Sequence, residues 1–333
     1  MITMRAVLLE RHGGPEALRI AEVPTPQPKR GEVRVRIRLI GINFAEVLSR
    51  RGVYGWAPKL PYILGMEAYG EIDAVGEGVT DRRAGDPVII GTQFGTYAEF
   101  ICIPAGRTLP PPSGFTPEES AAFSVSYLTA WIGLMEMARL RTTDTVLITS
   151  AAGGVGTAAV QIAKRFGAKV VGAAGANKQQ RIRDLGADLA LDYDQSGWDA
   201  QLPPLNTVLE MRGGAVYRSA LRHLAPMARV VIAGASEAFP RSRNPLAWLK
   251  ALREFPRPNL QKMLKRSYGI MSFHVGYLLD TGAVAPQWTE LVRFTEQHGI
   301  RPVVGQTFDF EHIADAHRAL EERRNIGKVL VRV

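Results

Sequence analysis

Cysteine is almost missing from this sequence, since the 333 residues include a single one, Cys102. An intramolecular disulfide is therefore impossible, and a cysteine-rich metal site is excluded. Long apolar runs are also missing, and no uninterrupted stretch is long enough to span a bilayer. The first residues lead directly into the strand-like Ala6-Val7-Leu8-Leu9, without the apolar core or the cleavage site of a signal peptide. We therefore expect a cytoplasmic protein.

The composition is that of a globular protein, with 46% hydrophobic and 22% charged residues, and the length predicts about two domains. A formal net charge of +9 would indicate nucleic acid or an anionic membrane surface as a binding partner if the cationic residues were concentrated in one region. Here they are scattered, and the densest stretch, Arg241 to Arg266, alternates them with prolines and leucines. We interpret it as a solvated face that also attracts an anionic cofactor. We expect no nucleic-acid partner and no integral membrane segment.

The first part of the chain predicts an antiparallel, barrel-like β domain. Between Glu32 and Gly41, three apolar residues alternate with arginines in the two-residue period of a half-buried strand. Glycine and proline separate this segment from further predicted strands at residues 5–9, 18–23, 69–75, 87–90 and 97–103. The pattern changes after the three prolines at 110–112.

The second part predicts a parallel, doubly wound sheet, so that the fold class is α/β. Apolar residues recur at helical spacing over 118–138, and a strand at 145–149, a helix at 156–166 and a strand at 169–173 follow. Further alternation extends the sheet, with strands at 187–191, 207–209 and 229–233 and a helix at 217–224. The tail, with helices at 288–298 and 313–323 and a strand at 328–333, is expected to rejoin the first domain.

A glycine turn lies between the first strand of the second part and its helix, which is the context of a dinucleotide-binding fingerprint. Gly153 leaves the backbone bare for a pyrophosphate, the helix N-terminus supplies unpaired amides, and Gly156 lets helix and strand approach closely. Ala151 replaces the usual first glycine. The alternative is a merely structural tight turn. The cofactor-binding residues expected in the turn are Ala152, Gly153, Gly154, Val155 and Gly156.

The end of the second strand indicates which dinucleotide binds, because NAD enzymes place an acidic residue there to bind the ribose hydroxyls. Here the positions are occupied by Ala173, Ala174 and Gly175, and no carboxylate repels a 2′-phosphate. Lys178 and Arg181 supply positive charge just beyond the strand. NADPH is therefore favoured over NADH, although Lys178 as a solvated residue at a helix start is the alternative.

Several motifs resemble the medium-chain dehydrogenase/reductase superfamily over nearly the whole chain, specifically its zinc-free, zeta-crystallin-like quinone oxidoreductase branch. They are Gly41-Ile-Asn-Phe-Ala45, Leu64-Gly-Met-Glu67 with Gly70, Val75-Gly-Glu-Gly78, Ala84-Gly-Asp86, Tyr97-Ala-Glu-Phe100, Leu128-Thr-Ala-Trp131 and the glycine turn with Gln161-Ile-Ala163. Residues 243–248 and 272–277 also resemble the subgroup of vesicle amine transport protein homologues. The resemblance implies a GroES-like catalytic domain at 1–123 and 272–333, a Rossmann NADPH-binding domain at 124–271, and a homodimer.

Zinc-dependent relatives have a cysteine and a histidine where this chain has Asn43 and Met66, neither of which is a plausible zinc donor here. The cysteine-rich lobe that binds structural zinc in those relatives is also missing, because Ile89 to Gly95 leads directly to Tyr97. The histidines show no ligand spacing, since His312 and His317 lie five apart on a predicted helix and point to different faces. We predict that the protein needs no metal.

The resemblance also implies the roles of individual residues. Asn43 is expected to donate from its amide, Tyr54 from its hydroxyl, and Thr129 to lie near the nicotinamide. A turn-forming Asn and a structural Tyr are the alternatives for the first two. The remaining expected cofactor contacts are Tyr193 at the adenosine phosphate, Arg323 as a C-terminal basic contact, Phe273 at the nicotinamide end, and Gly234 after the strand at 229–233. His274 is expected near Phe273, either as a proton donor or as a packing residue.

Without a Lewis acid the protein cannot easily polarise an alcohol, so we expect reduction of an acceptor that is already electrophilic. The predicted reaction is hydride transfer from NADPH to a quinone or a similar conjugated carbonyl compound. An enoyl-thioester or alkenal reductase of the same superfamily is the alternative enzyme. A further alternative is an NADPH-binding adaptor that contacts nucleic acid or a membrane through its basic surface. The sequence does not separate a cleft-covering role from a partner contact for the basic insertion at 247–266.

Overall fold

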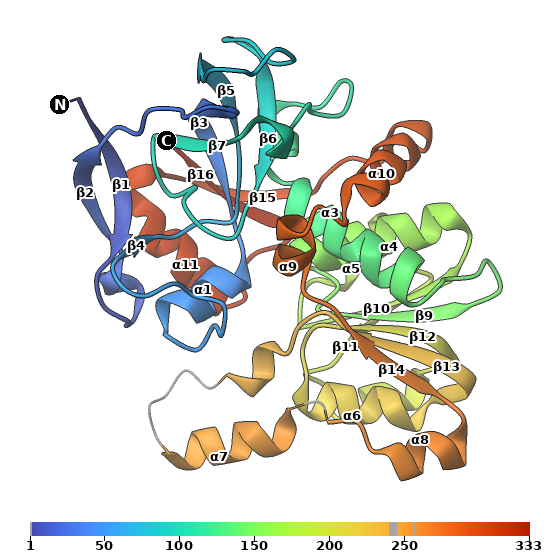
Figure 1. The fold of residues 1–333 in the computed structure, drawn as a ribbon. Coiled ribbons are helices and arrows are strands. Elements are labelled where there is room, and N and C mark those ends of the chain that lie inside the picture. Colours follow the sequence, from blue (N-terminus) through green and yellow to red (C-terminus); the bar gives the residue numbers. More distant parts are fainter. Residues whose placement is uncertain (1, 240–244, 256) are drawn as a thin grey trace. The chain divides into compact units, whose positions relative to one another are not determined.

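The structure is a computed structural model that describes residues 2–239, 245–255 and 257–333 (Figure 1). Arg241 and Arg243, at the start of the predicted basic stretch, lie outside the described residues. The chain divides into two compact units. Unit 1 comprises Met1–Val125, Gly276–Val284 and Arg301–Val333, and unit 2 comprises Ser126–Val275 and Ala285–Ile300. By this division residues 285–300 group with unit 2, whereas the sequence-based bounds of 1–123 plus 272–333 and 124–271 stay a prediction.

Unit 1 is built on two mainly antiparallel sheets, as the sequence predicts. One has the order β2-β1-β4, from the strands Arg19–Pro24, Thr3–Leu9 and Tyr62–Ile63. The other has the order β15-β16-β3-β5-β6-β8, with β7 (Phe100–Pro104) also paired to β3. Its strands are β15 (Val304–Asp309), β16 (Lys328–Arg332), β3 (Glu32–Ile42), β5 (Glu67–Val75), β6 (Pro87–Gly91) and β8 (Thr108–Leu109).

Strand β3 organises this larger sheet, because it pairs with β16, β5 and β7. Val33, Val35 and Ile37 are buried, as their alternation with arginines predicts. The β7 strand is shorter than the predicted 97–103, because Ala98 forms only an isolated bridge to Ala6.

The helices of unit 1 pack on these sheets. Helix α11 (Ile313–Glu321) buries Ile313 and Ala316 in a core cluster with Leu9 and Ile40. The shorter helical segments are η1 (Pro15–Ala17), α1 (Phe44–Arg50), η2 (Ala105–Arg107), α2 (Pro117–Ala121), α9 (Val275–Asp280, apart from its first residue) and η6 (Phe310–His312). Of the tail that is expected to rejoin the first domain, Arg301–Val333 belongs to unit 1, whereas the helix at 288–298 groups with unit 2.

Unit 2 contains a six-stranded parallel sheet in the order β11-β10-β9-β12-β13-β14. The strands are β9 (Thr145–Thr149), β10 (Lys169–Ala174), β11 (Leu189–Asp192), β12 (Leu205–Glu210), β13 (Leu224–Ile232) and β14 (Gly269–Ser272). In order of appearance this is 3-2-1-4-5-6, the Rossmann order, in which ligands bind outside the carboxyl ends of the strands where the order reverses. The predicted α/β fold class is confirmed.

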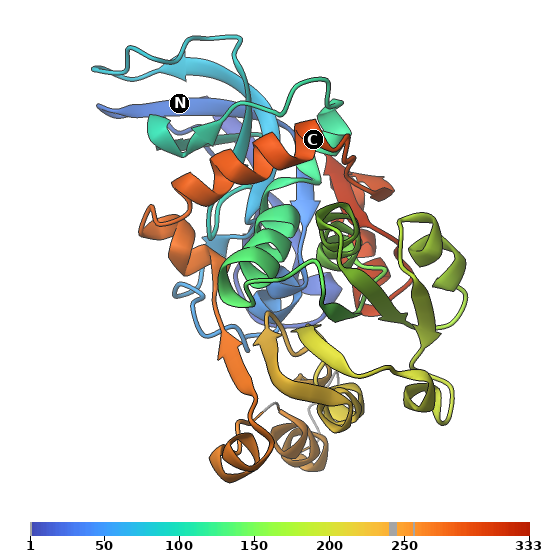
Figure 2. The ribbon, with the colours of Figure 1, turned by 90° about the vertical axis from the view of Figure 1, so that its right-hand side faces the viewer.

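Helices lie on both faces of the parallel sheet (Figures 1 and 2). The helices of unit 2 are α3 (Ser124–Trp131, from residue 126 on), α4 (Gly154–Phe166), α5 (Gln179–Asp184), α6 (Gly214–Arg222), α7 (Pro245–Glu254), α8 (Leu260–Arg266) and α10 (Ala285–Gln297), with short turns η4 (Trp198–Gln201) and η5 (Ser236–Ala238). A π-helical segment, Ile132–Met137, follows α3. The sequence predicts the first five strands of this sheet and misses the short sixth, β14.

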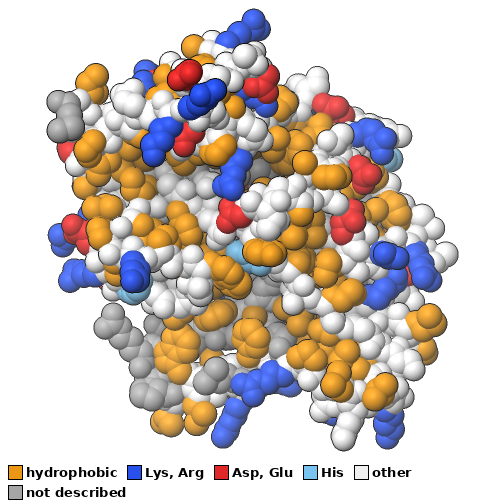
Figure 3. All heavy atoms as spheres, in the orientation of Figure 1, with side chains coloured by type: hydrophobic (Ala, Val, Ile, Leu, Met, Phe, Trp, Pro, Cys, Tyr) orange, Lys and Arg blue, Asp and Glu red, His pale blue; other side chains and the backbone are white. Residues whose placement is uncertain are grey.

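The basic insertion forms helices α7 and α8 at the lower edge of Figure 1. On α8, Leu260 and Leu264 are exposed one helical turn apart, next to the exposed Lys262 and Lys265. Figure 3 shows hydrophobic and basic side chains together along that edge. In the part of the chain that the structure describes, every helix is too short or too polar to cross a bilayer.

Candidate functional site

Asn43 is the N-cap of helix α1, and both atoms of its side-chain amide are used inside unit 1. Its backbone N–H donates to Glu46 Oε2 at 2.6 Å, which fixes the first turn of the helix. Its Nδ2 donates to Glu67 Oε1 at 3.0 Å, and its Oδ1 accepts a hydrogen bond from Lys328 Nζ at 2.7 Å. The two partners fix which end of the amide is the donor.

Glu67 and Lys328 form a buried ion pair, with side-chain exposures of 0% and 3%. The second carboxylate oxygen of Glu67 accepts from Ser124 Oγ at 2.7 Å and from the Val125 N–H at 2.8 Å. A buried pair is tolerated only when its remaining polar atoms are also satisfied, as here for the carboxylate. We call Asn43, Glu67 and Lys328 the buried trio.

Gly41 explains how the trio fits between strands. Gly41 lies in β3, opposite Glu67 of β5 and Leu330 of β16. A Cβ atom on Gly41 would lie 2.8 Å from Glu67 Cγ and 2.9 Å from Lys328 Cε. Glycine here therefore provides the space that the two charged side chains occupy.

The buried trio does not fit a zinc site. The ammonium group of Lys328 already provides a cation at Asn43, and it would repel a divalent ion placed beside it. Met66 is buried and offers only a thioether, a poor ligand for zinc. Within residues 2–239, 245–255 and 257–333, no group of three His, Cys, Asp or Glu side chains is arranged to hold a metal ion.

A second buried network extends from Glu46 through helix α1. Tyr97 OH donates to Glu46 Oε2 at 2.7 Å and lies 2.9 Å from His317 Nε2, and Arg50 donates to His317 Nδ1 at 3.3 Å. Because Arg50 has only donors, His317 Nδ1 is the acceptor, so Nε2 carries the proton and donates to Tyr97. Arg50 also pairs with Glu321 at 2.7 Å. His317 is fully buried in this network.

Burial determines the protonation of this network. It raises the pKa of Glu46 to about 7, against three hydrogen bonds from the Asn43 N–H, the Tyr97 hydroxyl and the Met66 N–H. Burial, followed by the nearby charge of Arg50, lowers the pKa of His317 well below its ordinary value, so the imidazole is neutral. The side chains of α1 and α11 are thus joined by one chain of directed hydrogen bonds.

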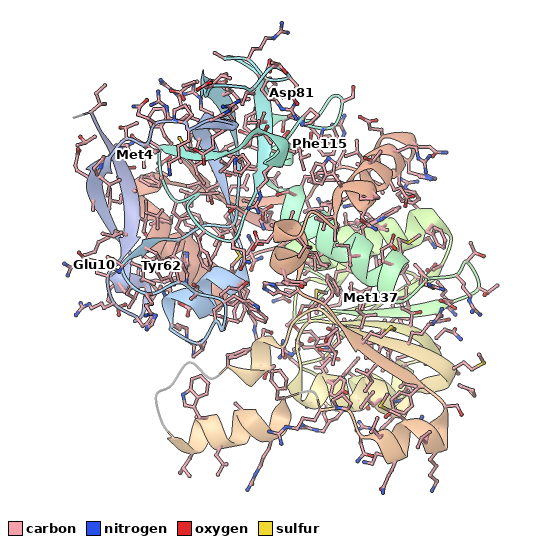
Figure 4. All side chains as sticks on the ribbon, viewed as in Figure 1. Met4, Glu10, Tyr62, Asp81, Phe115 and Met137 are labelled. Carbon is pink, nitrogen blue, oxygen red and sulfur yellow. The ribbon has the colours of Figure 1, made fainter. Side chains whose placement is uncertain are left out.

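Tyr54 follows helix α1 in a half-buried loop. Its ring lies 5.4 Å from the ring of Trp56 and 6.5 Å from that of Phe94, measured between centroids. Burial, with smaller effects of the Glu46 and Asp280 charges, raises the pKa of Tyr54 above its ordinary value. Its hydroxyl therefore keeps its proton at neutral pH. On α1 itself, Ser49 lies 2.7 Å from the hydroxyl of Tyr62, which is labelled in Figure 4.

The glycine turn of unit 2 joins β9 to α4. Gly153 is the N-cap of α4, and a Cβ atom there would make only ordinary contact, 3.5 Å from the Ser150 carbonyl oxygen. A Cβ atom on Gly156 would lie 2.3 Å from that same oxygen, so only glycine allows this close approach of helix and strand. The first helical turn thus presents free N–H groups at the carboxyl end of the sheet, where a pyrophosphate would fit.

The residues that are expected to contact the cofactor's 2′-phosphate follow strands β10 and β11 of the same sheet. Lys178 is the half-buried N-cap of α5, and Arg181 is exposed on that helix. Tyr193 follows β11, with a ring carbon 3.9 Å from a Cβ placed on Gly175. Asp194 lies beside Tyr193, and the guanidinium group of Arg212 stacks on the Tyr193 ring. Neither Asp194 nor Arg212 is among the site residues predicted from the sequence.

The remaining predicted residues are divided between the units. Thr129 is buried in α3, Gly234 follows β13, and Phe273 follows β14 with its ring 3.5 Å from a Cβ placed on Gly133. These three belong to unit 2, while Arg323 belongs to unit 1, where it is exposed after α11 with a φ of 56°. Their roles toward a cofactor stay predictions.

Glu67 and Lys328 are the residues of unit 1 that sequence reasoning missed as site residues. Glu67 ends the quoted motif Leu64-Gly-Met-Glu67, so a signal was present for it. Lys328 begins an ordinary apolar strand 285 positions after Asn43, and only the pairing of β16 with β3 brings the two together.

The chain matches the profiles of two protein families. One is described as the alcohol dehydrogenase GroES-like domain and matches residues 29–113, and the other is described as zinc-binding dehydrogenase and matches residues 185–331. The sequence is 33% identical, over 339 aligned residues, to the synaptic vesicle membrane protein VAT-1 homolog of Rattus norvegicus. That match covers 98% of this chain and 84% of the rat protein.

The fold is also similar to solved structures. A quinone oxidoreductase from Thermus thermophilus, solved alone and with NADPH, is similar with a TM-score of 0.82 and 35% identity, over 99% of this chain and 100% of that one. A mycobacterial protein in complex with NADPH is similar with a TM-score of 0.86 and 28% identity, again over 99% and 100% of the two chains.

Proposed function

This chain belongs to the medium-chain dehydrogenase/reductase superfamily of oxidoreductases, in its zinc-free quinone oxidoreductase branch, and we propose that it uses NADPH to reduce a quinone or a similar conjugated carbonyl compound. The family identified from the sequence is thereby confirmed. The acceptor, the cofactor and the independence from zinc are parts of the proposal.

The buried trio is the observation that carries this proposal. An ammonium group, and no metal ligand set, stands at Asn43, where zinc-dependent relatives have a ligand. A site without a Lewis acid suits an acceptor whose conjugation already spreads the incoming negative charge, and it suits a simple alcohol poorly. Reduction of a conjugated acceptor is therefore the chemistry that these residues support best.

Bound NADPH would supply a hydride to the acceptor, and a single proton from water or a side chain would complete the two-electron reduction. We propose that Tyr54 and the second N–H of Asn43 Nδ2, whose contact with the Gly41 carbonyl oxygen is long at 3.5 Å, donate hydrogen bonds to the acceptor oxygen as it gains charge. Lys328 holds Asn43 Oδ1, so the amide cannot flip and present its oxygen instead. Tyr54 remains protonated, and so it can act as a donor across the neutral range.

The residues of unit 2 fit the cofactor. The glycine turn offers helix N–H groups to the pyrophosphate, and β10 ends at Ala174 without the acid that would repel a 2′-phosphate. Lys178 stands three residues after Gly175, and its ammonium group can pair with that phosphate. The two similar proteins whose structures contain NADPH support the same choice.

A panel of acceptors tests the proposal. The purified protein would be mixed with NADPH and, separately, with a benzoquinone, an alkenal and a crotonyl thioester, and NADPH oxidation would be followed by absorbance. The proposal predicts the highest kcat/KM with the quinone. Highest kcat/KM with the thioester or the alkenal would instead identify a double-bond reductase, and no oxidation with any acceptor would contradict an enzymatic role of this kind.

A further inference from the structure

A carboxylate lies at the ribose end of the expected cofactor site, although the second strand itself supplies none. Asp194 follows β11, and its Oδ2 lies 2.8 Å from the position of a Cβ atom on Gly175, just after β10. In NAD-binding sites an acid at the end of the second strand accepts hydrogen bonds from the ribose hydroxyls. Asp194 places such an acid there from the neighbouring strand.

Arg212 faces this carboxylate from the loop after β12. Its Nη2 lies 3.6 Å from Asp194 Oδ1 and 2.9 Å from Glu237 Oε1, and its guanidinium carbon lies 3.8 Å from the centroid of the Tyr193 ring. The Arg212 side chain is 10% exposed, whereas that of Asp194 is 56% exposed. The cation is thus fixed against an aromatic ring, while the acid faces solvent.

The backbone holds Arg212 in this place. Its N–H donates to Glu210 Oε1 at 2.6 Å, and its carbonyl accepts the N–H of Glu237 at 2.7 Å. Glu210 is fully buried at the end of β12 and also accepts the N–H of Gly213. The guanidinium group therefore lies in one defined position at the carboxyl end of β10, β11 and β12.

We propose that Arg212 is a specificity-determining residue: by pairing with Asp194 it offsets the negative charge beside Gly175 and allows a 2′-phosphorylated cofactor to bind. An unpaired Asp194 would repel a phosphate at the ribose 2′ position and would accept the 2′-hydroxyl of NADH. Arg212, which also pairs with Glu237, reduces this repulsion, and Lys178 attracts the phosphate. This inference rests on the proposed use of NADPH.

Dissociation constants for NADPH and NADH, measured by fluorescence titration, test the inference in a cycle of four proteins. These are the parent, Arg212→Gln, Asp194→Asn and the double variant. Arg212→Gln should weaken NADPH binding roughly tenfold, the effect of one charge-assisted contact, and leave NADH within about threefold. Asp194→Asn alone should keep NADPH within about threefold of the parent. The double variant should recover most of the lost NADPH affinity, because the repelling charge is gone.

Arg222→Gln is the matched control, since it removes one cation of unit 2 from an ion pair that joins helix α6 to Asp199 in the turn η4. It should leave the NADPH to NADH ratio unchanged. A purely structural role of Arg212 would weaken both nucleotides equally, so the ratio separates the two roles.

Two results would overturn the inference while leaving the proposed function intact. In the first, the parent prefers NADPH over NADH and the Arg212→Gln variant keeps the same preference. In the second, the double variant binds NADPH as weakly as Arg212→Gln does. Arg212 would then act on the phosphate independently of Asp194. A parent that binds neither nucleotide would contradict both the inference and the proposed function.

Discussion

The ammonium group of Lys328 donates a hydrogen bond to the side-chain oxygen of Asn43 at 2.7 Å, although the two residues stand 285 positions apart. The same ammonium group pairs with Glu67, whose other oxygen is bound by Ser124 and Val125. The closing strand of the chain therefore fixes the amide at the start of helix α1. This arrangement connects the stability of unit 1 with the chemistry that we propose for it.

Loss of Lys328 should destabilise the protein strongly. In Lys328→Met, Glu67 keeps a buried charge without its cation, and breaking such a pair costs about 3–5 kcal/mol. The double variant Lys328→Met with Glu67→Gln removes both charges and should recover part of that loss. Urea unfolding measures both free energies, and Lys262→Met on exposed α8 is the control, expected to stay within about 0.5 kcal/mol. A double variant less stable than Lys328→Met would argue against the ion pair as the cause.

Tyr54 and Asn43 should act mainly on the acceptor. We expect Tyr54→Phe and Asn43→Ala each to lower kcat or raise the acceptor KM, because each removes one hydrogen-bond donor from the acceptor oxygen. The dissociation constant for NADPH should stay within about threefold of the parent, since neither residue belongs to the glycine turn. Steady-state kinetics and nucleotide titration make the comparison. Unchanged kcat and KM in both variants would show that the two side chains are structural.

Lys178 should select NADPH by pairing with its 2′-phosphate. A charge-assisted hydrogen bond contributes about 1.5–3 kcal/mol, which corresponds to a roughly ten- to hundredfold change in affinity. Lys178→Ala should therefore weaken NADPH binding near the lower end of that range and leave NADH nearly unchanged, with a smaller loss at high salt. Arg183→Ala, an exposed cation on the same helix, is the matched control. Equal losses for the two nucleotides would mean that Lys178 supports the fold or the pyrophosphate.

The burial of Glu46 should make stability fall between about pH 4.5 and pH 7. The pKa of Glu46 is raised from 4.5 to about 7 in the folded protein, so the folded state holds this proton more tightly than the unfolded state. The stabilisation is complete below the unfolded pKa and is lost as pH rises through the folded one. Over the whole window it amounts to on the order of 3 kcal/mol.

Glu46→Gln should flatten this pH dependence of stability. The variant should be less stable at every pH, because the glutamine amide cannot accept all three hydrogen bonds that the Glu46 carboxylate accepts. Urea unfolding of both proteins at several pH values gives the two slopes. Glu210 titrates in the same direction and stays in both, so it cancels in the comparison. Parallel slopes for the parent and the variant would show that Glu46 stays ionised in the folded protein.

The sequence predicts much of the fold because its local patterns agree with the tertiary structure. The alternation along β3 follows from one buried face, and the glycine turn between β9 and α4 follows from the close approach at Gly156. Strand β14, only Gly269–Ser272, is too short to show a period of its own. The helical spacing over 118–138 corresponds to α2 and α3, and the change to a π-helical segment at Ile132 is not predicted by it.

The unpredicted part of the site depends on contacts between distant segments. Lys328 looks like an ordinary strand residue, and Arg212 looks like a solvated arginine after a strand. Their partners are determined by the order of strands in each sheet, which brings β16 beside β3 and the loop after β12 near that after β11. No local pattern contains that information, since hydrophobic periodicity reports the buried face of a strand and not its neighbours.

The most direct test of the account is NADPH oxidation by a quinone with metal-depleted protein. The protein would be dialysed against a chelator, its zinc content measured, and its rate compared with that of an undialysed sample and of one resupplied with zinc. We expect no stoichiometric zinc and the same rate in all three samples, because the ammonium group of Lys328 stands at Asn43 where zinc would have to bind. A rate lost on chelation and restored by zinc would contradict the account.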